Sequence, residues 1–239
     1  MSTSVSTPKS ALLHRGPGFR IRQSIDRPDE SVVKRLAEFR SPDISDMLNR
    51  LYTMKSEIKN LTSDQWICGP ACTVKVYPGD NLMVHKALDV AKPGDVLVVD
   101  AGASAMNGIV GDLISTKAKF RGIQGFVIDG LIRDLQDIKD IEFPVFARGV
   151  TPVGPLHRGP GEINFSVCCG GIVVNPGDVI CGDENGLVVV RKEWAADLAQ
   201  WLEEQKSSAA GYEENVRKGI FDNSWVDNVL GEAGCTYED

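Results

Sequence analysis

The middle of the sequence alternates amphipathic segments with short apolar runs, and this alternation constrains the fold more than any other feature. Helical spacing predicts helices over 112–121 and 133–140, and apolar runs predict strands over 125–129 and 143–148. After residue 166 the predicted strands follow one another almost without interruption. Alternating strands and helices favour parallel pairing, whereas consecutive strands favour antiparallel pairing. We therefore predict a layered α/β fold with a mixed sheet.

Two amphipathic helices are predicted near the N-terminus. From Asp29 onwards, apolar residues recur three and four positions apart, which predicts a helix with one apolar face. Ser41 and Pro42 then predict the start of a second helix, with Ser41 as its N-cap. The segment 71–78 predicts a strand, and a further helix is predicted around residues 82–88.

The chain length and its patterning predict one main domain with two additions. A chain of 239 residues is long enough to bury a large core in a single domain. We expect residues 1–28 to form a polar tail, residues 29–206 to form the α/β domain and residues 207–239 to form a helical extension. The extension is amphipathic, which predicts that it packs against its own domain or at a subunit interface.

The composition argues against several classes of protein. A net charge of −7 and a pI near 5.1 argue against a nucleic-acid-binding face, although one Arg beside a helix N-terminus can still bind a small anion. No apolar run reaches the ~18 residues of a membrane helix, and no signal peptide is apparent. The cysteines form no zinc-binding pattern, so we expect buried, reduced thiols in a cytoplasmic protein. These are Cys68, Cys72, Cys168, Cys169, Cys181 and Cys235.

A short pattern occurs twice in the sequence. Residues 92–102 (KPGDVLVVDAG) and 175–185 (NPGDVICGDEN) share Pro-Gly-Asp-Val, followed by a second Asp five residues after the first. Each copy predicts a turn that leads into a buried strand ending in a carboxylate. Turn chemistry alone leaves two interpretations open, an internal repeat or two unrelated turns of similar composition.

Several familiar catalytic and cofactor sites find little support. The strand that ends at Asp100 lacks the further glycines of a dinucleotide-binding loop. His14, His85 and His157 are too dispersed to predict a metal cluster. We interpret His85, inside an amphipathic helix, as structural, and His157 as a surface-loop residue. No serine nucleophile motif and no Cys/His spacing typical of covalent catalysis is present.

Charged residues stand at the starts of two neighbouring predicted helices. Asp112 opens one helix, and Arg133 and Asp134 open the next, with 20 residues between Asp112 and Arg133. A helix, a turn and a strand fill this interval, so both helices should begin at the same edge of the sheet, where α/β proteins tend to bind ligands. The backbone amides of Leu113 and Ile114 are suited to bind a carboxylate there.

The chemistry of these three charged side chains suits an α-keto acid. Arg133 can donate to a ketone or enolate oxygen. Asp134, and Asp112 directly or through water, can supply oxygen ligands to an ion such as Mg²⁺. The alternative is that both Asp carboxylates only stabilise the helix dipoles, and the residues alone leave this alternative open.

The same region resembles the RraA-like superfamily. The resemblance runs from about Ser41 to about Arg191 and is carried by residues 111–138, 142–152 and 170–190. Its most specific part is the Asp-x20-Arg-Asp signature, which Asp112, Arg133 and Asp134 match, with Asp137 close behind. The best-defined enzymes of the superfamily are the class II, metal-dependent 4-hydroxy-4-methyl-2-oxoglutarate / 4-carboxy-4-hydroxy-2-oxoadipate aldolases.

This resemblance implies a fold and an assembly. It implies a swivelling α/β/β layered fold with a mixed sheet, N-terminal helices and a helical C-terminal extension. It also implies homotrimers, often paired into hexamers, with active sites between subunits. An acidic residue of the neighbouring subunit completes such a site, and Glu213 or Glu214 is our candidate for it.

The resemblance also implies an activity, the cleavage of a 4-hydroxy-2-keto acid to pyruvate, with oxaloacetate decarboxylation as a side activity. Pyruvate would be held by Arg133 and by the backbone from Gly111 through Leu113 to Ile114. Arg133 and Asp112 would be catalytic, and Asp134, with Asp112 through water, would hold Mg²⁺ or Mn²⁺. Loop residues within 151–165 are expected to contact the substrate beyond C4. A regulatory branch of the superfamily binds a ribonuclease instead, and this is the alternative function.

Overall fold

The computed structural model describes residues 18–238, apart from the side chains of residues 209 and 210. Most of the predicted tail, with His14, lies outside the described residues. The contacts divide the chain into two units between Ala199 and Gln200, so the boundary predicted after residue 206 falls inside helix α6 (Ala195–Arg217). Among the described residues, no helix combines the length and the apolar composition that crossing a membrane requires.

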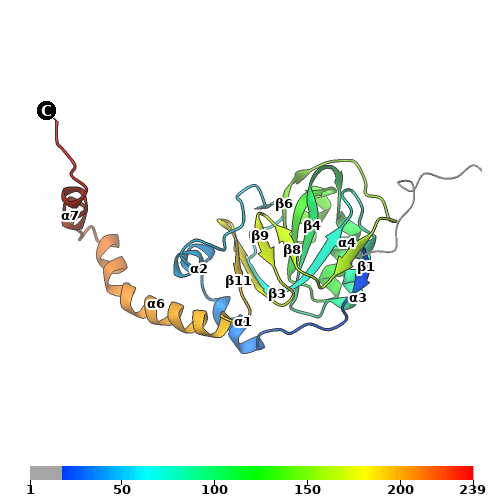
Figure 1. The fold of residues 1–239 in the computed structure, drawn as a ribbon, viewed down its shortest axis with the longest axis horizontal. Helices are drawn as coiled ribbons and strands as arrows, with labels where there is room; N and C mark the ends of the chain where they lie inside the picture. The colour runs from blue at the N-terminus through cyan, green and yellow to red at the C-terminus, as the bar shows by residue number, and fades with distance from the viewer. Residues whose placement is uncertain (1–17, 239) are drawn as a thin grey trace, which may run out of the picture. The chain divides into compact units, whose positions relative to one another are not determined.

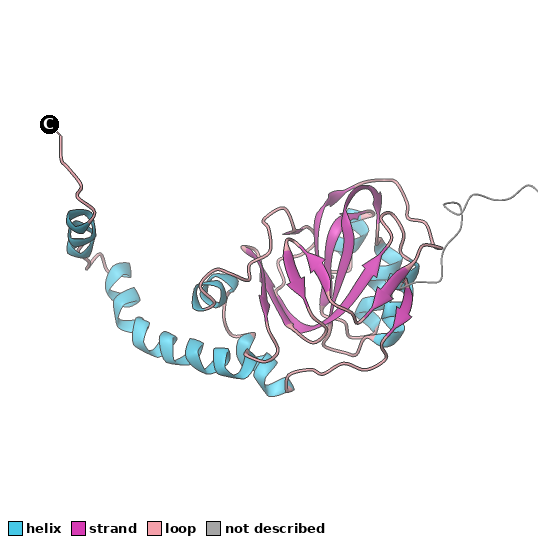
Figure 2. Ribbon diagram, in the orientation of Figure 1, coloured by secondary structure: helices cyan, strands magenta, loops and turns pink. Residues whose placement is uncertain are grey.

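A mixed sheet forms the centre of the first unit, as predicted (Figures 1 and 2). Strands β3 to β6 pair in parallel, whereas β7 is antiparallel to β3 and β2 is antiparallel to β6. The order of the strands is β1 (Phe19–Ile21), β7 (Gly161–Ile163), β3 (Ile67–Val76), β4 (Val96–Gly108), β5 (Gly125–Ile132), β6 (Val145–Val150) and β2 (Lys59–Asn60).

Strand β3 is long enough to pair with different neighbours along its length. Its second half pairs in parallel with β4, with Ala71 opposite Val96. Its first half pairs antiparallel with β10 (Val179–Asp183), which in turn forms a hairpin with β11 (Gly186–Val190). A separate hairpin consists of β8 (Val167–Cys169) and β9 (Ile172–Val174). The consecutive strands predicted after residue 166 are therefore confirmed.

Both faces of the parallel strands are covered, which explains their nearly continuous apolar sequences. Helices α3 (Leu82–Val90), α4 (Asp112–Phe120) and α5 (Leu135–Asp140) contribute to the core on one face, where Leu97 and Val99 of β4 also lie. Val96 and Val98 alternate to the opposite face and pack there in a second cluster with residues of the hairpins β8–β9 and β10–β11.

Helices α1 (Glu30–Leu36) and α2 (Ser41–Met47) form where the apolar spacing predicted them. The predicted N-cap of α2 is wrong, because Arg40 occupies that position and Ser41 begins the helix. The Ser41 side chain has another partner. The backbone amide and the side-chain hydroxyl of Ser41 donate to the Asp183 carboxylate at 2.8 and 2.7 Å, which joins α2 to the end of β10.

The two Pro-Gly-Asp-Val turns share hydrogen bonds as well as sequence. Asp95 accepts from the backbone amide three residues before it, at 2.8 Å, and from Arg27, with two bonds of 2.7 Å. Asp178 likewise accepts from the amide three residues before it, at 2.8 Å, and from Arg191, at 2.5 Å. Both carboxylates are buried, and each pairs with an Arg from another segment. This common arrangement favours the internal-repeat interpretation.

The cysteines are all free thiols, but they are not all buried as predicted. Cys168 and Cys235 are exposed. Cys168 lies outward because neighbouring residues of a strand face opposite sides, and Cys169 occupies the buried side of β8.

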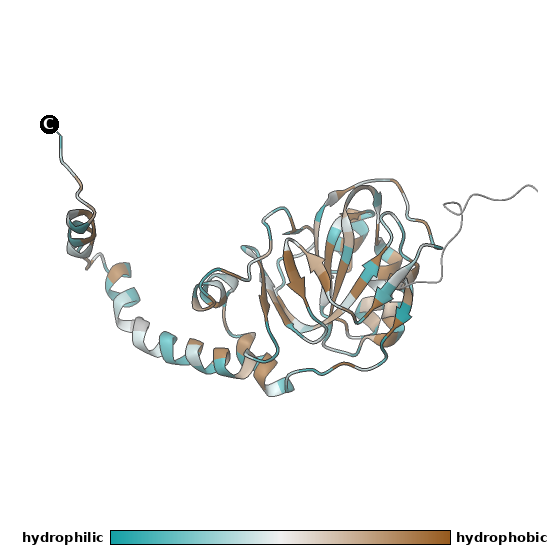
Figure 3. Cartoon of the chain, in the orientation of Figure 1, coloured by the Kyte–Doolittle hydropathy of each residue, from teal (hydrophilic) through white to brown (hydrophobic). Residues whose placement is uncertain are grey.

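The second unit is helical and consists of the remainder of α6 and of α7 (Ser224–Glu232). Its sequence mixes apolar and polar residues along both helices (Figure 3), and no residue of α7 is buried. The large apolar side chains that this unit exposes are Trp201, Tyr212, Val216, Ile220, Phe221, Trp225, Val229 and Tyr237.

The link between Asp183 and Ser41 makes a pH-dependent contribution to stability. Burial alone would raise the pKa of Asp183, but hydrogen bonds from Ser41 and Asn185 outweigh it and hold this pKa below its ordinary value. A carboxyl whose pKa is lower in the folded state stabilises the fold at neutral pH, and this contribution disappears as the pH falls through the folded pKa.

We therefore expect Asp183→Asn to lower the free energy of unfolding at pH 7 by about 1–3 kcal/mol, and by clearly less at about pH 3. Urea denaturation at the two pH values, with the exposed Asp64→Asn as a control variant, measures this difference. An equal loss at both pH values would show that the Asp183 charge does not stabilise the fold.

Candidate active site

Backbone pairing beyond the parallel strands brings the starts of α4 and α5 together. The amide of Ile109 donates to the Leu131 carbonyl at 2.8 Å. The amide of Arg133 in turn donates to the Val110 carbonyl at 3.0 Å. The two chain segments therefore stay paired up to the points where each helix begins, as the 20-residue interval in the sequence predicts.

The candidate residues of the first unit line one cavity of about 320 Å³. The charged side chains of Asp112, Arg133 and Asp134 come from the two helix starts. The cavity is also lined by Gly111, Leu113, Ile114, Asn81, His85, Lys117, Gly154, Pro155 and His157. The structure thus brings together every candidate except Glu213 and Glu214. These two lie on α6 in the second unit and form ion pairs there with Arg217 and Lys218.

Asp134 does not cap α5. It occupies the N-cap position, but its side chain makes no capping hydrogen bond, and its backbone is left-handed, with φ 54° and ψ 42°. Its Oδ2 lies 3.2 Å from Nε of Arg133. Left-handed backbone is uncommon for a residue other than Gly, and it occurs often at functional sites. Asp134 therefore makes no capping hydrogen bond to α5, although its charge at the helix start can still act on the helix dipole. Asp112 is the first residue of α4, so a contribution to the helix dipole stays open for it.

Two glycines leave room for the charged side chains. A Cβ atom at Gly111 would lie only 2.2 Å from Oδ2 of Asp134, and one at Gly154 would lie 2.8 Å from Nη1 of Arg133. Any larger residue at either position would displace the carboxylate or the guanidinium. The absence of a Cβ atom at both positions therefore lets these charged groups lie close to the backbone.

The start of α4 gives the cavity an anion-binding side. The first amides of a helix have no carbonyl one turn earlier to accept their hydrogen bonds, so Asp112, Leu113 and Ile114 present N–H groups there. Lys117, one turn further along the same helix, also lines the cavity, as does Arg133. A ligand that carries a carboxylate matches this arrangement.

Two histidines, His85 and His157, line the cavity. His157 is an exposed loop residue, as predicted. Its Nδ1 lies 2.7 Å from Oδ1 of Asn81, and its ring lies 5.6 Å from the ring of His85. Asn81 also donates from Nδ2 to the Ile109 carbonyl at 2.8 Å, which ties it to the end of β4. Nothing in the spacing of the histidines in the sequence indicated that they would meet.

His85 is uncharged at neutral pH. Burial lowers the pKa of its imidazole, and electrostatic interactions with Lys117 and His157 lower it further. An uncharged imidazole keeps one ring nitrogen as a hydrogen-bond acceptor. His85, interpreted from sequence as structural, is therefore also a polar group of the cavity wall.

A buried carboxylate holds the loop that carries His157. The amides of Arg158 and Gly159 both donate to Oδ2 of Asp80, each at 2.7 Å, and Asp80 stands just before α3. Through this link the loop 151–165 contributes Gly154, Pro155 and His157 to the cavity.

Comparison with known proteins gives a consistent result. Residues 41–189 match the model of the RraA-like family, described as Aldolase/RraA. A Halalkalibacterium halodurans protein named "Putative 4-hydroxy-4-methyl-2-oxoglutarate aldolase" is 41% identical over 180 residues, which cover 75% of this chain and 84% of that protein.

Solved structures agree with the fold. A Streptomyces coelicolor protein, described as an unusual member of the RNase ES inhibitor RraA family, superposes with a TM-score of 0.72 at 29% identity and covers 81% of this chain and 99% of its own. An uncharacterized protein of Pseudomonas syringae has the same fold, with a TM-score of 0.72 at 24% identity, covering 82% of this chain and 96% of its own.

The strained backbone at Asp134 predicts an unusual response to mutation. The left-handed conformation costs a residue with a side chain about 1–2 kcal/mol, whereas Gly adopts it readily. We expect Asp134→Gly to be at least as stable as the wild type and about 1 kcal/mol more stable than Asp134→Ala. Asp137→Gly, inside α5, should instead lose about 1 kcal/mol.

Chemical denaturation of the three variants measures these differences. A loss of stability in Asp134→Gly as large as that in Asp137→Gly would mean that the Asp134 carboxylate supports the fold, and would weaken its assignment to a ligand site.

Proposed function

Because the chain belongs to the RraA-like family, we propose that it is a metal-dependent class II aldolase. It cleaves a 4-hydroxy-2-keto acid to pyruvate and a second carbonyl compound. The name of the Halalkalibacterium relative supports a substrate of the 4-hydroxy-4-methyl-2-oxoglutarate / 4-carboxy-4-hydroxy-2-oxoadipate type. The observation that carries the proposal is the single cavity shared by Asp112, Arg133 and Asp134 at the start of α4.

The carboxylates of this cavity fit a hard divalent ion, either Mg²⁺ or Mn²⁺. Asp134 presents an oxygen that does not cap α5, and Asp112 lines the same cavity. Within residues 18–238 no group of three or more His, Cys, Asp or Glu side chains could hold a metal. Mg²⁺ needs no such cage, because it keeps several waters and is commonly bound by one or two carboxylates together with its substrate. We assign Asp134 as a direct ligand and Asp112 as a ligand through water.

When bound, this ion would supply a Lewis acid that stabilises negative charge on the keto acid. The residues of the chain bind the substrate and move the proton. The amides at the start of α4 hold the carboxylate next to the ketone. Arg133 donates to the ketone oxygen, where negative charge develops as the C3–C4 bond breaks. Asp112 accepts the proton of the C4 hydroxyl through a water molecule.

The other residues that line the cavity suit the remainder of the substrate. Lys117 can pair with a second carboxylate, and His85 and His157 can hydrogen-bond to it or to the C4 substituents. The enolate of pyruvate also forms when oxaloacetate loses CO₂, so oxaloacetate decarboxylation belongs to the same proposal as a side activity.

We also propose that the enzyme is a homotrimer or a homohexamer. The apolar side chains that the second unit exposes support an interface between subunits, because such residues are usually covered in solution. In this assembly Glu213 or Glu214 of a neighbouring subunit would complete the acidic groups of the site.

The alternative is a regulator that binds a ribonuclease without catalysis. The likeness to the Streptomyces coelicolor protein supports it, since that protein is described within an RNase ES inhibitor family. A protein-binding role gives no chemical reason to keep Asp112, Arg133 and Asp134 around one cavity, so we favour the enzyme. A pull-down with ribonuclease E, run beside an assay of pyruvate release, separates the two functions.

Replacing Arg133 tests the proposed catalytic role directly. We expect Arg133→Ala to lower kcat for pyruvate release by ~10²–10³-fold, because a donor to the developing oxyanion is lost. Arg133→Lys should recover only part of the activity, since an ammonium group lacks the planar fork of the guanidinium. Arg158→Ala serves as the matched control, because Arg158 is an exposed residue of the neighbouring loop that does not line the cavity. Wild-type turnover by Arg133→Ala would contradict this role.

Metal removal tests the assignment of Asp134. Dialysis against EDTA should abolish pyruvate release by the wild-type protein. Adding Mg²⁺ or Mn²⁺ should then restore pyruvate release by the wild type but not by Asp134→Asn. Since Asn replaces the charged oxygen with a neutral one, the variant should bind the ion far more weakly. Full activity in the presence of EDTA would rule out the metal-dependent scheme.

A further inference from the structure

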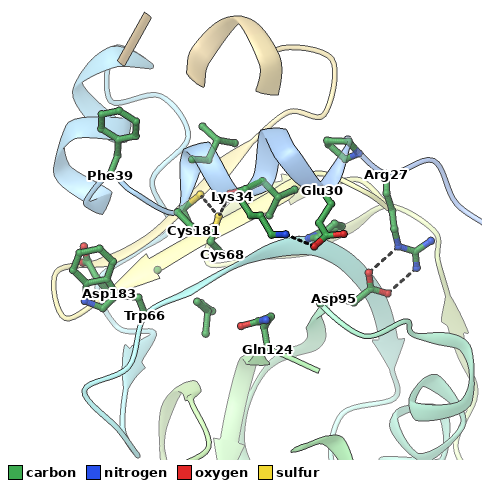
Figure 4. A pocket seen from close by; sticks show the side chains of 18 of the residues that line it. Arg27, Glu30, Lys34, Phe39, Trp66, Cys68, Asp95, Gln124, Cys181 and Asp183 are labelled. Carbon is green, nitrogen blue, oxygen red and sulfur yellow. Dashed lines mark hydrogen bonds and ion pairs between the residues drawn. The ribbon is translucent and has the colours of Figure 1, made fainter. Parts of the chain in front are cut away.

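A second and larger cavity lies apart from the candidate active site. Its volume is about 710 Å³, and none of the residues that line it lines the cavity of Asp112 and Arg133. Its walls come from α1, the start of α2, the first half of β3 and the end of β10 (Figure 4). The proposed aldolase reaction makes no use of this region, so its chemistry is independent of that proposal.

Two thiols meet in the wall of this cavity. Cys68 of β3 and Cys181 of β10 stand directly opposite each other in the antiparallel register, and their Sγ atoms are 3.6 Å apart (Figure 4). Opposite residues of antiparallel strands have Cα atoms about 4.5–5.5 Å apart, which falls within the range of about 4.4–6.8 Å that a disulfide spans. A disulfide between these cysteines would therefore need little backbone movement.

The two thiols differ in their access to solvent. Cys181 is buried, whereas Cys68 is only partly buried. The hydrogen bond with Cys68 and the burial of the group raise the pKa of Cys181 well above its ordinary value. Cys181 thus stays protonated, and Cys68 is the thiol that an oxidant in the cavity reaches first. Its thiol also donates to the Val33 carbonyl at 3.5 Å.

We propose that Cys68 and Cys181 form a reversible disulfide when the protein meets a hydroperoxide. The Cys68 sulfur attacks one peroxide oxygen, the O–O bond breaks, and Cys68 becomes a sulfenic acid while water or an alcohol leaves. Cys181 then attacks the Cys68 sulfur, the S–O bond breaks, and the hydroxyl group leaves as water with the Cys181 proton. Both cysteine sulfurs are oxidised, and the peroxide accepts the two electrons. A small thiol reverses the reaction by exchange.

The other cysteines provide internal comparisons. Cys72 and Cys169 are buried, and burial raises the pKa of Cys72 to about 12 and that of Cys169 well above its ordinary value. Cys168 and Cys235 are exposed, so they are open to oxidation. Among the described residues, Cys68 and Cys181 are the pair of thiols whose sulfur atoms lie within hydrogen-bond distance of each other.

The disulfide would have a mechanical consequence. It would link Cys68 and Cys181, which are 113 positions apart in the chain. The chain segment between these two cysteines contains Asp112, Arg133 and Asp134. Closing so long a loop lowers the entropy of the unfolded chain, so the oxidised protein should unfold at a higher urea concentration than the reduced protein. Since the active-site cavity has no residue in common with this region, oxidation should leave the reaction there unchanged.

The test combines peptide mapping with urea unfolding on the full chain. The protein is treated with a small excess of hydrogen peroxide, blocked with an alkylating agent, digested without reduction and analysed by mass spectrometry. We expect a peptide pair linking Cys68 to Cys181 that has lost two hydrogens and separates after dithiothreitol treatment. The urea midpoint should rise on oxidation and return on reduction.

Cysteine variants make the test specific. Cys68→Ala should abolish both the linked peptide and the rise of the midpoint, whereas Cys168→Ala should keep both. If Cys68→Ala fails to fold, the mapping of the wild-type protein alone still decides. Alkylation of Cys68 and Cys181 as free thiols after peroxide treatment, or conversion of Cys68 to a sulfinic acid with Cys181 unlinked, would overturn the proposal.

Discussion

The structure depends on the continued pairing of the chain segments that leave β4 and β5. Hydrogen bonds from Ile109 to Leu131 and from Arg133 to Val110 extend the parallel pair beyond the regular strands, across register shifts within β4. Because these bonds join backbone groups, they place two helix starts side by side whatever side chains follow. The positions of Asp112, Arg133 and Asp134 are a direct result. The aldolase proposal adds only the chemistry that these three side chains carry.

Local patterns predicted the fold well because each strand and helix of the centre carries its own periodicity. The mixed sheet, the helices near 112 and 133 and the late hairpins followed from apolar spacing and from the order of the elements. The interval of 20 residues also predicted that Asp112 and Arg133 would meet, since a helix, a turn and a strand return the chain to the same edge. The family resemblance supplied the chemistry expected of this geometry, and the biochemical experiments test it.

Tertiary partners decided what the sequence did not reveal. Ser41 has the residue type of an N-cap, but the buried Asp183 carboxylate accepts bonds from it instead. His85 and His157 reach the same cavity because Asn81 and Asp80 tie a distant loop to the start of α3. Such contacts depend on which segments the fold brings together, and no local spacing encodes them. The left-handed backbone of Asp134 is likewise visible only in three dimensions.

The most direct measurement of the central claim is a crystal structure with Mn²⁺ and pyruvate, in which the anomalous signal locates the ion. The account predicts a peak in the cavity within about 2.0–2.3 Å of an Asp134 carboxylate oxygen, with Arg133 in contact with pyruvate. Ordered pyruvate without an anomalous peak near Asp134 at saturating Mn²⁺, or an ion bound elsewhere, would contradict it.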